Sequence, residues 1–164
     1  MKFSIIAIAL LLSVGIAFAS DKPNLGKPSN KAENWRFEQH EAGKGTMKID
    51  GDAAVFETTN ADGEDWHVQA VMTGLDLKDG KEYVVSFKAK GDPARTIKLA
   101  GTIDVDDWHA IGLSEDVELT KDWKDFSFPF KADSVAADKK NRVAFVLGGD
   151  KGTVMVKDLT ITEK

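Results

Sequence analysis

The feature that most constrains the fold of this chain is a two-residue alternation of apolar and polar side chains that recurs in short segments. In residues 81–90, Tyr83, Val85 and Phe87 alternate with polar residues such as Ser86. Successive side chains of a strand point to opposite faces, so this pattern predicts a strand with one buried face. No long helical periodicity follows residue 33, and we therefore expect an all-β domain.

Eight further segments have strand character and are separated by turns rich in Gly, Asp and Asn. They are residues 35–40, 46–50, 53–59, 66–73, 96–104, 123–132, 141–149 and 152–162. About nine strands at this spacing predict a two-sheet antiparallel β-sandwich.

The beginning of the chain has the features of a secretory signal peptide. Lys2 precedes an apolar run over residues 5–18, and Ala17 and Ala19 form an A-x-A cleavage pattern. The run is short for a membrane span of about 20 residues. We therefore expect cleavage of residues 1–19 and a secreted protein, extracellular or periplasmic.

The remainder divides into a leader and one domain. Residues 20–33 are polar and contain two prolines, which predicts a flexible leader before a domain at residues 34–164. The full chain has 22 basic and 27 acidic residues, and loss of Lys2 with the signal leaves a net charge of −6. Such a domain, without basic clusters, is a poor binder of nucleic acid or anionic membranes. The chain has no cysteine, so the core must provide its stability, and we expect a monomer.

The order of the motifs along the chain is similar to that of a known family. The motifs are W-R-F-E (35–38), D-W-H-V-Q (65–69), L-x-x-G-K-x-Y-x-x-S-F-x-A (77–89), L-T-x-D-W-x-x-F-x-F-x-F (119–130), R-V-A-F-V-L-G (142–148) and G-T-V-x-V-x-D-L (152–159). Together they resemble the jelly-roll carbohydrate-binding modules of families four, nine and twenty-two, over residues 34–162. The resemblance implies non-catalytic binding of a polysaccharide or oligosaccharide, a β-linked glucan or xylan, in a concave cleft on one sheet.

The resemblance also implies which residues line that cleft. Trp66 and Trp108 match the flanking aromatic residues, and Gln69 and Arg142 match polar residues of the cleft. Aromatic rings stack on the apolar faces of sugars, and amide and guanidinium groups bind their hydroxyls. Trp66 has the wrong parity to share a face with Gln69 in a regular strand, so it must lie at a loop edge or a bulge.

Other residues near these positions are less clearly assigned. His67 and His109 each follow a cleft tryptophan and are candidates to bind sugar hydroxyls, although an exposed histidine without a ligand is the alternative. Leu113 and Val146 stand where some members of the family carry a cleft arginine and a cleft histidine. The remaining tryptophan that precedes three phenylalanines, Trp123, is predicted to lie in the core.

A structural calcium ion is a further implication of the resemblance. The positions that match its ligands are Glu38, Asp52 or its neighbours, and Asp158. Calcium binds six to eight hard oxygen ligands and cross-links the strands that supply them. Ordinary ion pairs, for example with Lys157 or Lys48, are the alternative for these carboxylates.

Two other functions remain open at this point. A glycoside hydrolase needs two facing carboxylates, and Asp104 and Asp106 would share one face if the strand of residues 96–104 continued. The family motif that such a pair resembles begins and ends with glutamate, whereas the corresponding positions here are Thr102 and Asp106. The third function is that of a structural or adhesive cell-surface protein.

Overall fold

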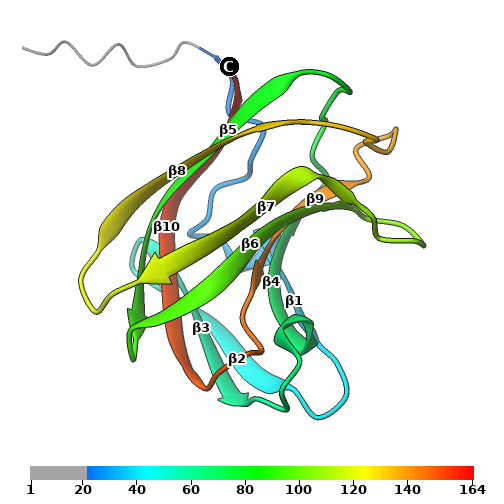
Figure 1. The fold of residues 1–164 in the computed structure, drawn as a ribbon. Coiled ribbons are helices and arrows are strands. Elements are labelled where there is room, and N and C mark those ends of the chain that lie inside the picture. Colours follow the sequence, from blue (N-terminus) through cyan, green and yellow to red (C-terminus); the bar gives the residue numbers. More distant parts are fainter. Residues whose placement is uncertain (1–21) are drawn as a thin grey trace, which may run out of the picture.

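The computed structural model describes residues 22–164, so the predicted signal peptide, residues 1–19, lies outside the described residues. Two five-stranded antiparallel sheets pack face to face as a jelly-roll β-sandwich, which confirms the predicted fold class (Figure 1). The strands are β1 (Arg36–Gln39), β2 (Lys44–Asp50), β3 (Ala53–Asn60), β4 (Val68–Thr73), β5 (Glu82–Asp92), β6 (Arg95–Ile103), β7 (Ala110–Leu119), β8 (Lys124–Lys131), β9 (Asn141–Val146) and β10 (Gly152–Glu163).

Each sheet mixes strands that are distant in the sequence. Sheet A has the order β1-β4-β9-β6-β7, and sheet B has the order β2-β3-β10-β5-β8. The central strands, β9 and β10, come from the end of the chain. Residues far apart in the sequence therefore become neighbours, for example Gln69 and Val146 in the register of β4 and β9.

The core lies between the two sheets and follows the alternation seen in the sequence. Tyr83, Val85 and Phe87 of β5 are buried, as are Val143 and Phe145 of β9. Burial of one such side chain contributes about 1.5–3 kcal/mol. The core thus forms without disulfides, and it fixes which residues of each strand face outward.

The prediction omitted one strand, β7. Ile111, Leu113 and Val117 of this strand are buried against the core, so the alternation is present in the sequence. Gly112 and the polar run that begins at Ser114 conceal it, because glycine is depleted in strands and a polar face resembles a loop. Leu113 is fully buried and cannot occupy the cleft position at which the family resemblance placed it.

Trp123 differs from its prediction, whereas Trp35, which is 7% exposed, belongs to the core. Trp123 is half-buried on the outer face of sheet B. The ammonium groups of Lys90 and Lys157 lie 5.1 and 4.7 Å from its ring centroid. The ring therefore packs under two lysines rather than between the sheets.

Part of the segment expected to be a flexible leader packs on the domain. The backbone N–H of Leu25 donates to the carbonyl oxygen of Ile161 at 2.8 Å, and Asn24 Oδ1 accepts from the Ile161 N–H at 2.8 Å. Trp35 Nε1 donates to the Ser29 carbonyl oxygen at 2.7 Å. These bonds hold residues 24–29 along β10, so ordered structure begins before residue 34.

The described chain contains little helix. Two 3-10 helices, η1 (Ala32–Asn34) and η2 (Asp65–His67), each form a single turn. Within residues 22–164 there is no helix long and apolar enough to cross a membrane.

Candidate functional site

Two tryptophans are the exposed large hydrophobic side chains of the described chain. Trp66 is 46% exposed and Trp108 is 47% exposed. Trp66 lies in η2, immediately before β4, and Trp108 lies in the turn between β6 and β7. Exposed aromatic rings are unfavourable in water, so a pair that opens onto one pocket indicates a binding surface.

The parity of Trp66 is explained by η2. Strand β4 begins only at Val68, so Trp66 belongs to a helical turn and not to the strand. The side-chain Nε2 of Gln69 donates to the carbonyl oxygen of Trp66 at 2.9 Å. This bond ties the turn to the outward face of β4, and Trp66 and Gln69 line the same pocket, as the sequence required.

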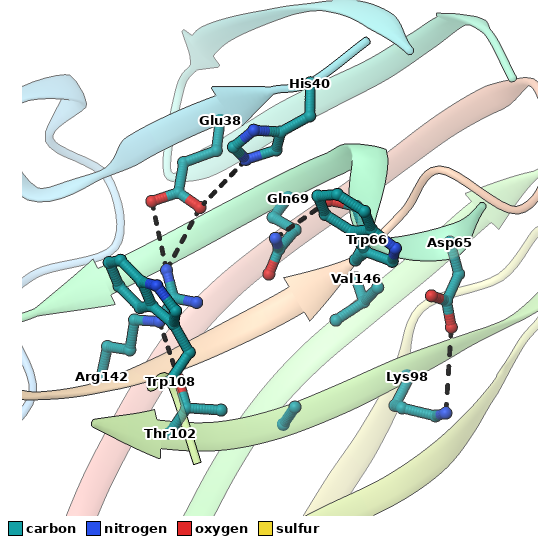
Figure 2. Close-up of a pocket in the computed structure, with 11 residues that line it drawn as sticks. Glu38, His40, Asp65, Trp66, Gln69, Lys98, Thr102, Trp108, Arg142 and Val146 are labelled. Carbon is teal, nitrogen blue, oxygen red and sulfur yellow. Dashed lines mark hydrogen bonds and ion pairs between the residues drawn. The ribbon is translucent and has the colours of Figure 1, made fainter. Parts of the chain in front are cut away.

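A pocket of about 470 Å³ covers the outer face of sheet A between the two tryptophans (Figure 2). Outward-facing residues of β1, β4, β9 and β6 form its floor. The lining residues are Glu38, His40, Asp65, Trp66, Gln69, Lys98, Ala100, Thr102, Trp108, Arg142 and Val146. All four residues that the resemblance placed in a cleft, Trp66, Gln69, Trp108 and Arg142, therefore meet in one pocket.

Arg142 is the centre of the polar network in this pocket. Its Nη1 donates to both carboxylate oxygens of Glu38 at 3.1 Å, and its Nε donates to Thr102 Oγ1 at 2.8 Å. Its guanidinium carbon lies 4.6 Å from the ring centroid of Trp108. Because the Arg142 side chain is only 7% exposed, burial of its guanidinium is unfavourable, and the ion pair with Glu38 offsets that cost.

The other charges of the pocket are also paired. Lys98 Nζ lies 3.8 Å from Asp65, and His40 Nε2 lies 3.7 Å from Glu38. The His40 ring also lies 5.3 Å from the ring of Trp66. Glu38 thus lies between Arg142 at one tryptophan and His40 at the other, as Figure 2 shows.

The comparison with known families now assigns the chain. Residues 26–153 match the family model described as a carbohydrate binding domain. The chain belongs to this family. Membership points to a domain that binds carbohydrate without catalysis, and the fold and the pocket agree with it.

Solved structures similar to this carbohydrate binding domain share its fold. One, described as "CBM4 structure and function", is 25% identical, has a TM-score of 0.70, and the match covers 88% of this chain and 96% of that chain. The N-terminal cellulose-binding domain of β-1,4-glucanase C from Cellulomonas fimi is 17% identical, with a TM-score of 0.66 and coverage of 85% and 95%. A family 11 carbohydrate-binding module from Clostridium thermocellum, in complex with a β-1,3-1,4-mixed-linked tetrasaccharide, is 16% identical, with a TM-score of 0.58 and coverage of 83% and 92%. None of the curated proteins matches the sequence.

The two histidines that follow the tryptophans of this carbohydrate binding domain do not line the pocket. His67 is buried, with 7% exposure, and its Nδ1 lies 2.7 Å from Asp62 Oδ2. Its hydrogen bond lowers the pKa of Asp62 below the ordinary value. His109 is bound to Asp107 and to the Ser134 carbonyl oxygen.

The three residues assigned to calcium do not converge. Glu38 lies on sheet A, where it neutralises Arg142, whereas Asp52 and Asp158 line a separate cavity of about 310 Å³ together with Ser29. Asp52 forms an ion pair with Lys157 at 3.0 Å, which is the alternative that the sequence left open. Among residues 22–164 no three His, Cys, Asp or Glu residues form a group that could hold a metal ion.

The carboxylate pair considered for hydrolysis is not formed by a strand. Strand β6 ends at Ile103, so Asp104 and Asp106 lie in the following turn. Asp104 accepts two hydrogen bonds from Arg36, and Asp106 does not line the pocket. The strand geometry on which that alternative depended is absent from this turn.

Several pocket residues could have been found from the alternation alone. Lys98, Ala100 and Thr102 share the outward face of the strand predicted at residues 96–104, and Val146 shares that of Arg142. The contributions of His40 and Asp65 could not be predicted, because both lie just outside strands.

Proposed function

We propose that this carbohydrate binding domain holds a β-linked glucan or xylan chain in the pocket of sheet A. Trp66 and Trp108 stack on the faces of sugar rings, and Gln69 and Arg142 bind hydroxyl groups. The observation that supports this proposal most strongly is that both exposed tryptophans open onto one pocket with a polar floor. β-linked chains are extended and present flat ring faces with equatorial hydroxyls, which suits a row of aromatic and polar groups across adjacent strands.

The hydrogen-bonding capacity left in the floor supports the proposal. Within residues 22–164, the described hydrogen bonds occupy Nε and Nη1 of Arg142 and Nε2 of Gln69. Nη2 of Arg142 and Oε1 of Gln69 have no such partner, which leaves one donor group and one acceptor for the ligand. Both side chains are nearly buried and fixed by their other bonds, so little entropy is lost when they bind a sugar.

The charge balance of the pocket supports a neutral ligand. Each arginine or lysine side chain that lines it lies within 4 Å of a carboxylate, Arg142 with Glu38 and Lys98 with Asp65. A uronate carboxylate would meet Glu38 and Asp65 without an unpaired cation to offset them. An uncharged glucan or xylan has no such cost.

Alanine variants of the two tryptophans test the proposal. Loss of one buried aromatic contact costs about 1.5–3 kcal/mol, so Trp66→Ala and Trp108→Ala are each expected to weaken binding about 10- to 100-fold. The matched control is Trp123→Ala, which removes a tryptophan from the outer face of sheet B. Affinity electrophoresis in β-glucan and xylan gels measures the effect, with circular dichroism to verify folding. Unchanged mobility of both pocket variants would refute the assignment.

We further propose that the domain acts after secretion and binds calcium. The signal-like features of residues 1–19 support secretion. For calcium, the support is now limited to Asp52 and Asp158, which line one cavity together with residues 28–30. Carboxylate and carbonyl oxygens from separate segments are a suitable ligand type for that ion.

A further inference from the structure

The two tryptophans of the pocket share a local arrangement. Each is followed by a histidine whose Nδ1 lies within hydrogen-bonding distance of an aspartate: His67 with Asp62 at 2.7 Å, and His109 with Asp107 at 2.8 Å. Neither histidine lines the pocket. A direct role in sugar binding therefore does not explain this repeated arrangement.

The ring of His67 packs against the ring of Trp66. The two rings are 4.1 Å apart between centroids and meet edge to face at 79°. Asp62 Oδ2 also accepts the backbone N–H of Ala42 at 3.1 Å, so the carboxylate that holds His67 is itself fixed. The exposed indole of Trp66 thus packs against the buried ring of His67, whose rotation is restricted by its bond to Asp62.

His109 ties the turn that carries Trp108 to a second loop. Its Nε2 lies 2.7 Å from the carbonyl oxygen of Ser134, which follows β8, while its Nδ1 faces Asp107. Asp107 and Trp108 adopt φ angles of 88° and 50°, a left-handed conformation that is unfavourable for residues other than glycine. Without the hydrogen bonds of His109, relaxation of this turn to a more common backbone conformation would be favourable.

We propose that His67 and His109 are positioning residues that hold Trp66 and Trp108 in their binding orientation before the sugar arrives. This inference rests on the proposed glycan-binding pocket and deepens it. A platform that is already ordered loses less conformational entropy on binding, which increases affinity without a new contact. The two His–Asp pairs therefore act on the ligand only through the tryptophans.

The protonation of His109 adds a specific consequence. Both ring nitrogens face acceptors, and the Ser134 carbonyl and then Asp107 raise the pKa of His109 above its ordinary value. Asp133, in the loop after β8, adds to the same effect. The His109 ring can thus donate to both acceptors while it is protonated, and this pair of hydrogen bonds weakens as the pH rises through the raised pKa. Affinity is expected to decline over that range in wild type and to show no such decline in Trp108→Ala.

A double-mutant cycle separates positioning from direct contact. His109→Ala is expected to weaken glycan binding about threefold to tenfold, and less than 1.5-fold when Trp108→Ala is already present. Asp107→Asn should weaken glycan binding as much as His109→Ala does. Asp106→Asn, which alters another carboxylate in the same turn, should leave the affinity unchanged. Equal losses in both backgrounds would mean that His109 touches the sugar and would overturn the proposal. For the other tryptophan, His67→Phe keeps a ring beneath Trp66 while it removes the bond to Asp62, and the same cycle applies with Trp66→Ala.

A measurement on the free protein makes the inference independent of the ligand. The indole N–H signals of the four tryptophans can be assigned from single Trp→Phe variants, and their ¹⁵N heteronuclear NOE reports ring order. His109→Ala should lower the NOE of Trp108 and leave Trp123 unchanged. If Trp108 stays as ordered as in wild type, the positioning role is wrong even where the tryptophans bind glycan. If order falls but the tryptophan variants bind normally, positioning stands and the glycan-binding proposal fails.

Discussion

Replacement of Glu38 by glutamine tests how the floor of the pocket is stabilised. The Glu38 carboxylate receives both hydrogen bonds from Arg142 Nη1, and it also accepts from Arg36 Nε at 2.6 Å. The glutamine side chain has the same shape but no charge. In Glu38→Gln, Arg142 keeps Thr102, the face of Trp108 and one amide oxygen as partners, but it loses its carboxylate partner.

The expected cost follows from the burial of the two groups. Loss of one partner of a fully buried ion pair costs about 3–5 kcal/mol. Here the Arg142 side chain is 7% exposed and that of Glu38 is 17% exposed, and the new amide oxygen still accepts one bond. We therefore expect a decrease of about 2–3 kcal/mol in the free energy of unfolding. At about 2–4 °C per kcal/mol for a domain of this size, the melting temperature should fall by roughly 4–12 °C.

Asp104→Asn is the matched control for this variant. Asp104 also binds Arg36, but the Arg36 side chain is 42% exposed and loses little when a carboxylate is removed, about 0–1 kcal/mol. Urea unfolding followed by tryptophan fluorescence, at constant pH and salt, measures both free energies. Equal effects of Glu38→Gln and Asp104→Asn, within about 0.5 kcal/mol, would refute the claim that Glu38 holds a buried cation.

Two further predictions concern backbone geometry and calcium. Gly112 has a φ of 97°, and an alanine Cβ there would collide with the Lys131 carbonyl oxygen, whereas at Gly80, with a φ of 76°, no described atom lies within 4 Å of that position. Gly112→Ala should therefore lower the free energy of unfolding by about 2–4 kcal/mol and Gly80→Ala by about 1 kcal/mol, measured in urea; similar values would contradict the steric explanation. If Asp52 and Asp158 hold calcium, addition of the ion at 100 times its dissociation constant should add about 2.7 kcal/mol over a chelated sample in thermal melts, and Asp158→Asn should remove the gain while Glu38→Gln keeps it. An unchanged midpoint, with no metal by elemental analysis, would eliminate the site.

The pocket brings together the residues that the sequence analysis assigned to a cleft. Trp66, Trp108, Gln69 and Arg142 were all assigned to a cleft by resemblance. The structure brings these four residues into one pocket. The prediction that Trp66 lies outside the regular strand was also correct, since Trp66 belongs to η2. Strand parity is a local property that can be read from a single segment.

Two of the errors have a common physical origin. Glu38 was assigned to calcium, yet it pairs with Arg142, which is 104 positions away in the chain. Residues 24–29 were expected to be flexible, yet they bind the backbone of β10 near the other end of the chain. Each misassignment concerned a polar group whose partner is distant in the sequence, and local composition carries no information about such partners.

The sequence by itself therefore determined the approximate positions of nine of the ten strands and the buried faces of several of them. It could do so because apolar periodicity is recorded residue by residue along each strand. Only the tertiary structure decided which carboxylate neutralises Arg142 and which loop carbonyl oxygen binds His109 Nε2. Such pairings depend on the strand order of sheet A and on the loops that meet at its rim. Long-range hydrogen bonds form wherever the packing of the apolar core brings polar groups together, and this chain places several of them at the pocket of sheet A.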